Sequence, residues 1–189
     1  MPGVSAVVLA AGQSKRMGGP NKLLMPWHDT TVLGAVLRAL DPMALDTLVV
    51  TGRDREDIAT LAASKDVVWN KDFALGLSSS IRTGVAARPL ARGYLFVLGD
   101  TPELRTEVVA TVLELAAVAS QDAIIAPRYM ADATPFGHPV YFGSAYFEDL
   151  LRLSGDRGAR PIIEANREKL ITFDVPGRLT DIDLPGELP

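Results

Sequence analysis

Residues 7–24 read VVLAAGQSKRMGGPNKLL, an apolar run followed by a loop with three glycines and three basic side chains. The whole chain is acidic, with a formal charge of -4, so this loop gathers positive charge against the trend. A strand that leads through a glycine loop into a helix presents backbone N–H groups to anions, and basic side chains add to that attraction. The stretch therefore predicts a local anion site.

Two familiar phosphate loops are excluded by their spacing. A Walker A loop has four residues between its glycines and ends in Gly-Lys followed by Ser or Thr, whereas five residues separate Gly12 from Gly18 here and GGPNK follows. The dinucleotide pattern GxGxxG is also absent. From the loop alone, another kind of phosphate loop and a glycine-rich turn with solvated lysines are about equally supported.

Outward from this loop, short apolar runs alternate with helical patterns. The expected strands are residues 4–9, 47–51, 67–70, 94–98 and 123–126. The expected helices are residues 31–40, 55–63, 77–87 and 103–119. This alternation predicts an α/β fold with three layers, in which a mostly parallel sheet carries helices on both faces. Ligands of such sheets bind at the carboxyl ends of the strands, where the glycine loop and Asp100 both fall.

The last third of the chain has a different texture. After Pro127 come a polar loop, the segment GHPVYF, helical patterns at residues 144–153 and 161–167, and a final strand at 170–175. With 189 residues and 48% apolar side chains, the chain fits one domain, residues 1–189, better than two. We expect residues 128–189 to be an elaboration that shapes one side of the ligand site.

The composition excludes several classes of protein. The chain has no cysteine, which excludes disulfides and thiolate metal sites, and its two histidines leave little for zinc. Its acidic balance argues against nucleic acid as a partner. No apolar stretch approaches the roughly 20 residues that span a bilayer, and no charged segment precedes the first hydrophobic run, so we expect no membrane partner and a cytoplasmic protein.

The whole string LAAGQSKRMGGPNKLL resembles the signature of the molybdenum cofactor cytidylyltransferase family, among the MobA-like nucleotidyltransferases. Arg16, Met17, Gly18 and Lys22 carry the match. The resemblance implies the Rossmann-like fold of nucleotide-diphospho-sugar transferases and the transfer of CMP from CTP to molybdopterin, with release of pyrophosphate. It implies that residues 1–127 bind the nucleotide and that residues 128–189 bind the acceptor and carry a C-terminal metal motif.

By this resemblance, the loop amides and Arg16 hold the β- and γ-phosphates, and Lys22 reaches the phosphate chain nearer the site of attack. Positive charge is needed there because negative charge accumulates on the departing pyrophosphate. The implied nucleotide-binding residues of this segment are Leu9, Ala10, Ala11, Gly12, Ser14, Arg16 and Lys22.

Asp100 stands in YLFVLGDTPEL, just beyond an apolar strand. It is placed either to cap a helix that starts near Glu103 or to hold magnesium through its carboxylate oxygens. The resemblance favours magnesium, because the family has a GD-x-P motif whose Asp binds the catalytic metal. The C-terminal LTDIDLPGEL is similar to the family's second metal motif, which implies Asp183 as the second ligand and Asp181 as the alternative. The implied catalytic residues are Arg16, Lys22 and Asp100.

The segment ALGLSSSIRTG opens a helix after the third strand. Serines at a helix start are ordinary capping residues. They also resemble the family's GLSSSL motif, which implies that Gly76, Ser78, Ser79 and Ser80 line the pocket for the base and ribose. Together with LAAG in place of LAGG, this motif favours CTP over GTP, because Ala11 adds a methyl group that would crowd a purine.

The segments TPFGHPVYF and GDRGAR resemble the acceptor side of the family site, which implies acceptor contacts from His138, Arg157 and Arg160. A packed histidine and structural surface arginines explain the same residues about as well. The loop RYMADATPF departs from the shorter family loop, so the acceptor is the least constrained part of the prediction. The family also implies a molybdoenzyme as the partner that receives the product.

Three other functions fit the sequence less well. The same fold could use GTP or another acceptor. The chain could bind and deliver a nucleotide or cofactor without catalysis. A hydrolase built on a serine among Ser78, Ser79 and Ser80 with His138 and Asp100 is least supported, because no nucleophile elbow is present.

Overall fold

The computed structural model describes residues 3–13, 20–182 and 185–188 of the chain. A seven-stranded sheet runs through its centre in the order β5-β4-β1-β6-β8-β7-β9. The strands are β1 Val4–Ala10, β4 Asp46–Thr51, β5 Asp66–Trp69, β6 Gly93–Leu98, β7 Ile124–Tyr129, β8 Val140–Gly143 and β9 Leu170–Val175. A separate two-stranded ribbon is formed by β2 Pro26–Trp27 and β3 Thr30–Thr31. All pairs in the large sheet are parallel except those that β8 makes with β6 and β7.

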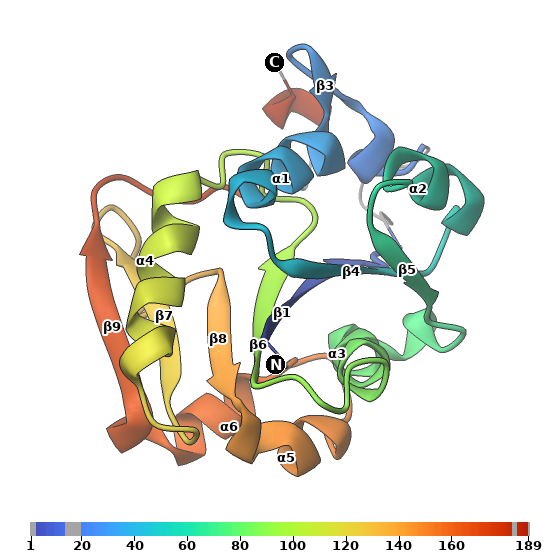
Figure 1. Cartoon of the computed structure of the whole chain (residues 1–189). Coiled ribbons are helices and arrows are strands. Elements are labelled where there is room, and N and C mark those ends of the chain that lie inside the picture. Colours follow the sequence, from blue (N-terminus) through green and yellow to red (C-terminus); the bar gives the residue numbers. More distant parts are fainter. Residues whose placement is uncertain (1–2, 14–19, 183–184, 189) are drawn as a thin grey trace.

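Helices cover both faces of the sheet (Figure 1). One face carries α1 Val32–Leu40, α2 Arg55–Leu61 and α4 Thr106–Val118. The other carries α3 Leu77–Ala86, α5 Phe147–Leu151 and α6 Arg160–Ala165. Short 3-10 helices are η2 Lys22–Leu24, η3 Asp41–Met43, η4 Phe73–Leu75, η5 Ser144–Tyr146, η6 Arg167–Lys169 and η7 Pro185–Glu187. The predicted three-layer α/β fold is confirmed.

The central strand explains why its sequence is apolar without alternation. Ala6 and Val8 are buried in one hydrophobic core, under α1 and α4, whereas Val7 and Leu9 are buried in the other, under α3. Both faces of a sheet covered by helices exclude water, so every position along the strand favours an apolar side chain.

Three sequence expectations about the elements were wrong in detail. The helix expected from residue 103 starts at Thr106, because Arg105 has extended backbone angles and is its N-cap residue, so Asp100 does not cap it. Residues 144–153 form the 3-10 turn η5 and the short α5 rather than one helix. The strand expected at 123–126 continues to Tyr129, because β7 pairs with β9 along its whole length.

The topology creates one natural ligand crevice. From β1 the chain adds β4 and then β5 on one side, and returns to place β6 on the other side of β1. Leu9 of β1 pairs with Leu98 of β6, so the residues after each strand emerge together at the carboxyl edge. Such a switch in strand order is where open α/β sheets bind ligands.

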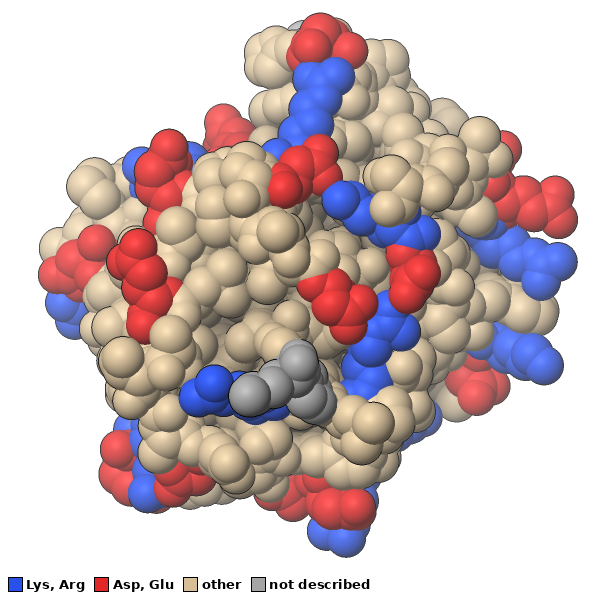
Figure 2. Space-filling view, viewed as in Figure 1, with Lys and Arg blue, Asp and Glu red and all other residues tan. Residues whose placement is uncertain are grey.

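The molecular surface mixes both signs of charge. On the face shown in Figure 2, Lys and Arg side chains alternate with Asp and Glu rather than merging into one basic stripe. Within residues 3–13, 20–182 and 185–188, no helix combines the length and apolar character needed to span a bilayer.

Candidate active site

A cavity of about 250 Å³ opens at the carboxyl ends of β1 and β6, and we call it the strand-end cavity. Its lining comes from the ends of β1 and β6 and the loops that follow them, from η4 and the start of α3, and from one residue of the loop 154–158. The lining residues are Leu9, Ala11, Gly12, Gln13, Phe73, Gly76, Leu77, Ser80, Leu98, Asp100 and Asp156. Six of the residues predicted for the site therefore meet in one hollow: Leu9, Ala11, Gly12, Gly76, Ser80 and Asp100.

The two predicted charged groups of the described site are in direct contact. Lys22 Nζ lies 2.7 Å from Asp100 Oδ2, and the two side chains are only 10% and 23% exposed. The 3-10 turn η2 holds Lys22 in place, because the side chain of Asn21 accepts a hydrogen bond from the Leu23 N–H. A charge-assisted contact of this length brings a cation and a carboxylate to the edge where phosphate and metal chemistry is expected.

The C-terminal segment reaches the same place. The Ile182 N–H donates a hydrogen bond of 2.9 Å to the backbone carbonyl of Asp100, and Ile182 is buried in the core under α1. Asp181 is exposed beside it and lines a neighbouring hollow with Thr101 and His138. Asp183, the preferred second metal ligand, lies outside the described residues, as do Ser14 and Arg16. Among the residues described, no group of three or more His, Asp or Glu side chains is arranged to hold a metal.

The start of α3 is completed by a distant loop. Gly76 has a positive φ of 98°, and a Cβ there would lie 2.7 Å from Asp156 Oδ1, so only glycine suits this position. Asp156 Oδ1 accepts a hydrogen bond of 3.1 Å from the Leu77 N–H, the first of the helix. A carboxylate at this end also complements the helix dipole. The loop of residues 154–158 thus substitutes for a local N-cap.

The three serines of α3 have different neighbours. Ser78 Oγ donates to the Ser154 carbonyl at 3.1 Å, and Ser79 Oγ donates to the Gly76 carbonyl at 2.8 Å. Both tie parts of the chain together, and neither lines the strand-end cavity. Only Ser80 does. Ala10 is fully buried in the core and also stands off the cavity lining.

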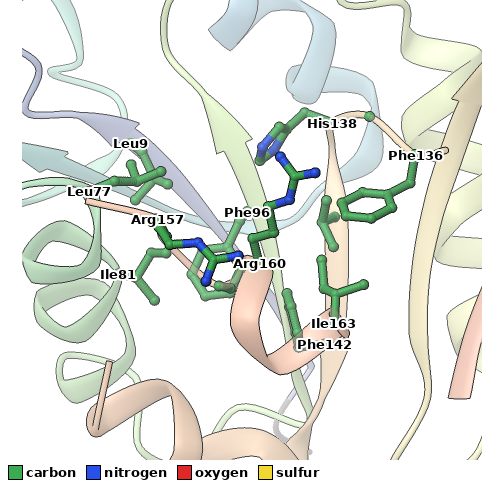
Figure 3. A pocket seen from close by; sticks show the side chains of 13 residues that line it. Leu9, Leu77, Ile81, Phe96, Phe136, His138, Phe142, Arg157, Arg160 and Ile163 are labelled. Carbon is green, nitrogen blue, oxygen red and sulfur yellow. The ribbon is translucent and has the colours of Figure 1, made fainter. Parts of the chain in front are cut away.

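A second pocket of about 210 Å³ adjoins the first, and we call it the arginine pocket. It is lined by Leu9, Leu77, Ile81, Phe96, Phe136, Gly137, His138, Val140, Phe142, Arg157, Ala159, Arg160 and Ile163. Leu9 and Leu77 line both hollows. Figure 3 shows Arg157 and Arg160 extending over this pocket, with Ile81 on one side and Phe136 on the other. All three predicted acceptor residues, His138, Arg157 and Arg160, therefore share one pocket.

One carboxylate orients both arginines. Arg157 Nη2 donates to Glu164 Oε2 at 2.7 Å, and Arg160 Nε donates to Glu164 Oε1 at 3.2 Å. The hydrogen bond from Arg157, with the charges of both guanidinium groups, lowers the pKa of Glu164. Although the two arginines are largely exposed, this shared partner holds them side by side above an apolar floor.

His138 lies between the arginine pocket and the hollow that contains Asp181. Burial lowers its pKa, while the Phe96 carbonyl and the charges of Asp100 and Asp181 act in the opposite direction. Its backbone carbonyl accepts a hydrogen bond of 2.9 Å from Tyr129, whose pKa is raised to about 12 by burial. The imidazole is therefore a neutral group in the wall between the two hollows.

Several residues of the site were not predicted from the sequence. Phe73 and Asp156 line the strand-end cavity, Asn70 donates a hydrogen bond to Ser80 in its lining, and Glu164 accepts hydrogen bonds from the two arginines of the second pocket. Asn70 directly follows an apolar strand at the carboxyl edge, a signal that was available. Nothing in the sequence indicates that Glu164, on α6, orients Arg157.

The described geometry is that of an open α/β sheet with a hollow at the carboxyl ends of β1 and β6 and a second pocket beside it, the edge at which such sheets bind ligands. A comparison with protein families identifies the class more closely. Residues 6–170 match the model of the MobA-like NTP transferase domain. The chain belongs to this family and is a nucleotidyltransferase.

Its relatives have several activities. The chain is 28% identical to the purine catabolism protein PucB of Bacillus subtilis, over 98% of this chain and 94% of the relative. It is 23% identical to the molybdenum cofactor cytidylyltransferase of Escherichia coli, over 99% of this chain and 94% of that protein. A molybdenum cofactor guanylyltransferase of Pseudomonas aeruginosa is 30% identical over 61% of this chain and 58% of its own length.

Among solved structures, Rv0371c of Mycobacterium tuberculosis is similar over most of both chains. It is 31% identical, with a TM-score of 0.81 over 96% of this chain and 92% of Rv0371c. A structure of Rv0371c in complex with manganese gives 29% identity and a TM-score of 0.79, over 95% of this chain and 92% of Rv0371c.

Proposed function

We propose that the protein is a magnesium-dependent cytidylyltransferase that transfers CMP from CTP to molybdopterin and releases pyrophosphate. Residues 1–127 would bind the nucleotide, and residues 128–189 would bind the acceptor and complete the metal site. The observation that carries the proposal is the contact between Lys22 and Asp100 at the edge of the strand-end cavity. This contact brings together the two groups that nucleotidyl transfer requires, a cation for the phosphate chain and a carboxylate for the metal ion.

In this reaction, a phosphate oxygen of the acceptor attacks the α-phosphorus of CTP. The bond from that phosphorus to the bridging oxygen breaks, and pyrophosphate leaves with the electron pair. The attacking oxygen is already an anion at neutral pH, so no general base is required. Lys22, released from Asp100, would neutralise the charge that develops on the phosphate chain. Arg16 would hold the β- and γ-phosphates.

Asp100 fits magnesium by its chemistry. Mg²⁺ prefers carboxylate oxygens and is usually held by one or two of them, with phosphate oxygens and water completing its shell. Asp100 supplies such a carboxylate next to the cavity, and the backbone contact from Ile182 brings the segment that precedes Asp183 beside it. When bound, the ion would stabilise negative charge on the α-phosphate.

The arginine pocket supports an acceptor that combines a flat ring with a phosphate. Its floor contains Phe96, Phe142 and Ile163, which favour a planar apolar surface. Arg157 and Arg160 above it keep N–H donors for an anion beyond those given to Glu164, because each guanidinium has five. Molybdopterin has both parts.

The preference for CTP is supported by Ala11, which is buried and lines the strand-end cavity, where its methyl group narrows the space for a base. The matched guanylyltransferase makes GTP the direct competitor. A protein that binds nucleotide without catalysis is the other class to be tested.

The deciding experiment measures pyrophosphate release with CTP, GTP, ATP and UTP, each with molybdopterin and magnesium and each without acceptor. Of the four nucleotides, we expect only CTP to release pyrophosphate, and only when the acceptor is present. Faster release from GTP would assign the guanylyl reaction. Binding of CTP with no pyrophosphate under any condition would contradict an enzymatic role, and release that depends on a different phosphate acceptor would reject molybdopterin.

A further inference from the structure

The side chain of Asn70 lies behind the strand-end cavity and contacts two of the serines of α3. Asn70 follows β5, is only 2% exposed, and is anchored by a hydrogen bond of 2.8 Å from its N–H to the Thr51 carbonyl. Its Nδ2 donates to Ser79 Oγ at 2.8 Å and to Ser80 Oγ at 3.1 Å. The side-chain amide is therefore fixed in position and fully used.

The direction of each hydrogen bond in this group follows from its partners. The Asp72 N–H can only donate, and it does so to Asn70 Oδ1 at 3.0 Å. This fixes the oxygen of the amide on the Asp72 side and leaves Nδ2 to face the serines. Ser79 passes its own proton to the Gly76 carbonyl, which can only accept. Ser79 must therefore accept from Asn70.

Ser80 ends this chain of hydrogen bonds. Its oxygen accepts from Asn70, so its hydroxyl proton cannot point back to that amide. Ser80 is 4% exposed, lines the strand-end cavity, and donates to no other residue in the described structure. The side with space for its proton is the cavity. A buried hydroxyl with a committed direction discriminates strongly, because a ligand that offers no acceptor there leaves the donor unsatisfied.

We propose that Asn70 is a positioning residue that fixes the Ser80 hydroxyl as a hydrogen-bond donor to the carbonyl oxygen of cytosine. This inference rests on the proposed use of CTP. Cytosine has two strong acceptors on its pairing edge, the ring nitrogen N3 and the carbonyl oxygen O2, and we assign the Ser80 donor to O2, the only carbonyl of the base. The base would lie over Ser80, with Phe73 and Ala11 among the apolar neighbours that line the same cavity.

The test compares CTP with 2-thiocytidine triphosphate, in which sulfur, a weak acceptor, replaces that oxygen. Dissociation constants are measured by calorimetry in the presence of magnesium and without acceptor, so no turnover is involved. We expect the wild-type protein to bind CTP about tenfold more tightly than the thio analogue. In Ser80→Ala the ratio of the two dissociation constants, thio analogue to CTP, should fall to about one. Ser80→Thr, which keeps the hydroxyl, should retain a ratio of about ten.

Two variants test Asn70 itself. In Asn70→Asp the carboxylate can only accept, so it draws the Ser80 proton away from the cavity, and the ratio should fall to about one although Ser80 is intact. Asn70→Ala adds no charge and frees the hydroxyl, which should give a ratio between those of the wild type and Ser80→Ala. Thr83→Ala is the matched control, because Thr83 bonds only the Ser79 carbonyl on the same helix and lies off the cavity. It should keep the tenfold ratio.

A folded Asn70→Asp or Asn70→Ala variant, shown by thermal unfolding, that keeps the tenfold ratio would overturn the role of Asn70. A tenfold ratio in Ser80→Ala would overturn the donor. If the wild type releases pyrophosphate from CTP but binds CTP and the thio analogue equally tightly, the inference fails and the proposed function stands. If CTP gives no pyrophosphate with any acceptor, both fail.

Discussion

The strand-end cavity and the arginine pocket share a wall but are built in different ways. The cavity takes Gly12 and Asp100 from loops that directly follow two paired central strands, and Lys22 and Asp100 are mostly buried. The arginine pocket takes its charges from Arg157 and Arg160, which are 62% and 59% exposed and belong to a loop and a short helix. The sheet thus fixes the position of the charged groups at the strand-end cavity, whereas the arginine pocket depends on side chains that can change without disturbing the core.

The largest effect should come from Asp100→Ala. Loss of the carboxylate removes the proposed metal ligand and leaves Lys22 without this partner, so kcat should fall about 1000-fold or more, and by the same factor for every acceptor. The measurement is steady-state pyrophosphate release. Asp174→Ala, which removes an exposed carboxylate paired with Arg128 on the edge strand, should retain wild-type turnover. Turnover by Asp100→Ala at the wild-type rate would remove the basis for the distinction between the two regions.

Gly84→Ala tests the support that the two regions share. A Cβ at Gly84 would overlap Val7 Cγ1 and lie 3.2 Å from Val50 Cγ2, so α3 must move away from β1 and β4. We expect the free energy of unfolding to fall by about 1–3 kcal/mol, measured by denaturant unfolding. Gly3→Ala, where a Cβ meets no atom within 4 Å, is the control and should be neutral. An unchanged stability would mean that α3 is not closely seated on the sheet.

Arg157→Ala and Arg160→Ala should affect only the acceptor side. Each variant should lower kcat/KM for the acceptor by about tenfold while the KM for CTP stays within about twofold, because the guanidinium groups contact the pocket above Phe96 and not the strand-end cavity. Arg152→Ala, an exposed arginine paired with Glu148 on α5, is the matched control. A rise in the KM for CTP as large as that for the acceptor would show that the two regions are not separate.

The smallest effect concerns the pH dependence of stability through His138. Burial lowers the pKa of His138 in the folded state, so between that value and about 6.5 only the unfolded chain binds the proton. Stability linked to this residue is therefore complete above about pH 6.5 and is lost as the pH falls toward the folded pKa. The free energy of unfolding, measured with urea at several pH values from about 7.5 to about 5, should fall less steeply with decreasing pH for His138→Gln than for the wild type. Equal slopes would place His138 in contact with water.

Much of the nucleotide side could be predicted from the sequence. Buried strands such as Val4–Ala10 are apolar at every position, and glycine or aspartate directly after them marks the carboxyl edge. The order of the strands was not predicted from the sequence, and it is the pairing of β6 with β1 in the structure that brings Gly12 and Asp100 together. The roles of Arg16 and Lys22 toward phosphate, and of Asp183 toward metal, stay predictions, and Arg16 and Asp183 lie outside the described residues.

The acceptor side was less predictable because it depends on contacts between distant residues. The motif GDRGAR indicated Arg157 and Arg160, but their common partner Glu164 depends on the path of α6. The sequence also gave no sign that Asp156 would complete the start of α3, since 79 positions separate it from Leu77. Likewise, GHPVYF indicates a strand, but only the packing shows that β8 runs antiparallel between β6 and β7.

The hydrogen bonds that the start of α3 donates to the loop of residues 154–158 limit how this loop could be exchanged. A chimera that takes its acceptor loop from a relative would separate Asp156 from Leu77 and Ser154 from Ser78. Segments 76–82 and 153–158 would therefore have to be exchanged together. Grafting one segment without the other would break these contacts and disturb the start of α3, which lines the strand-end cavity.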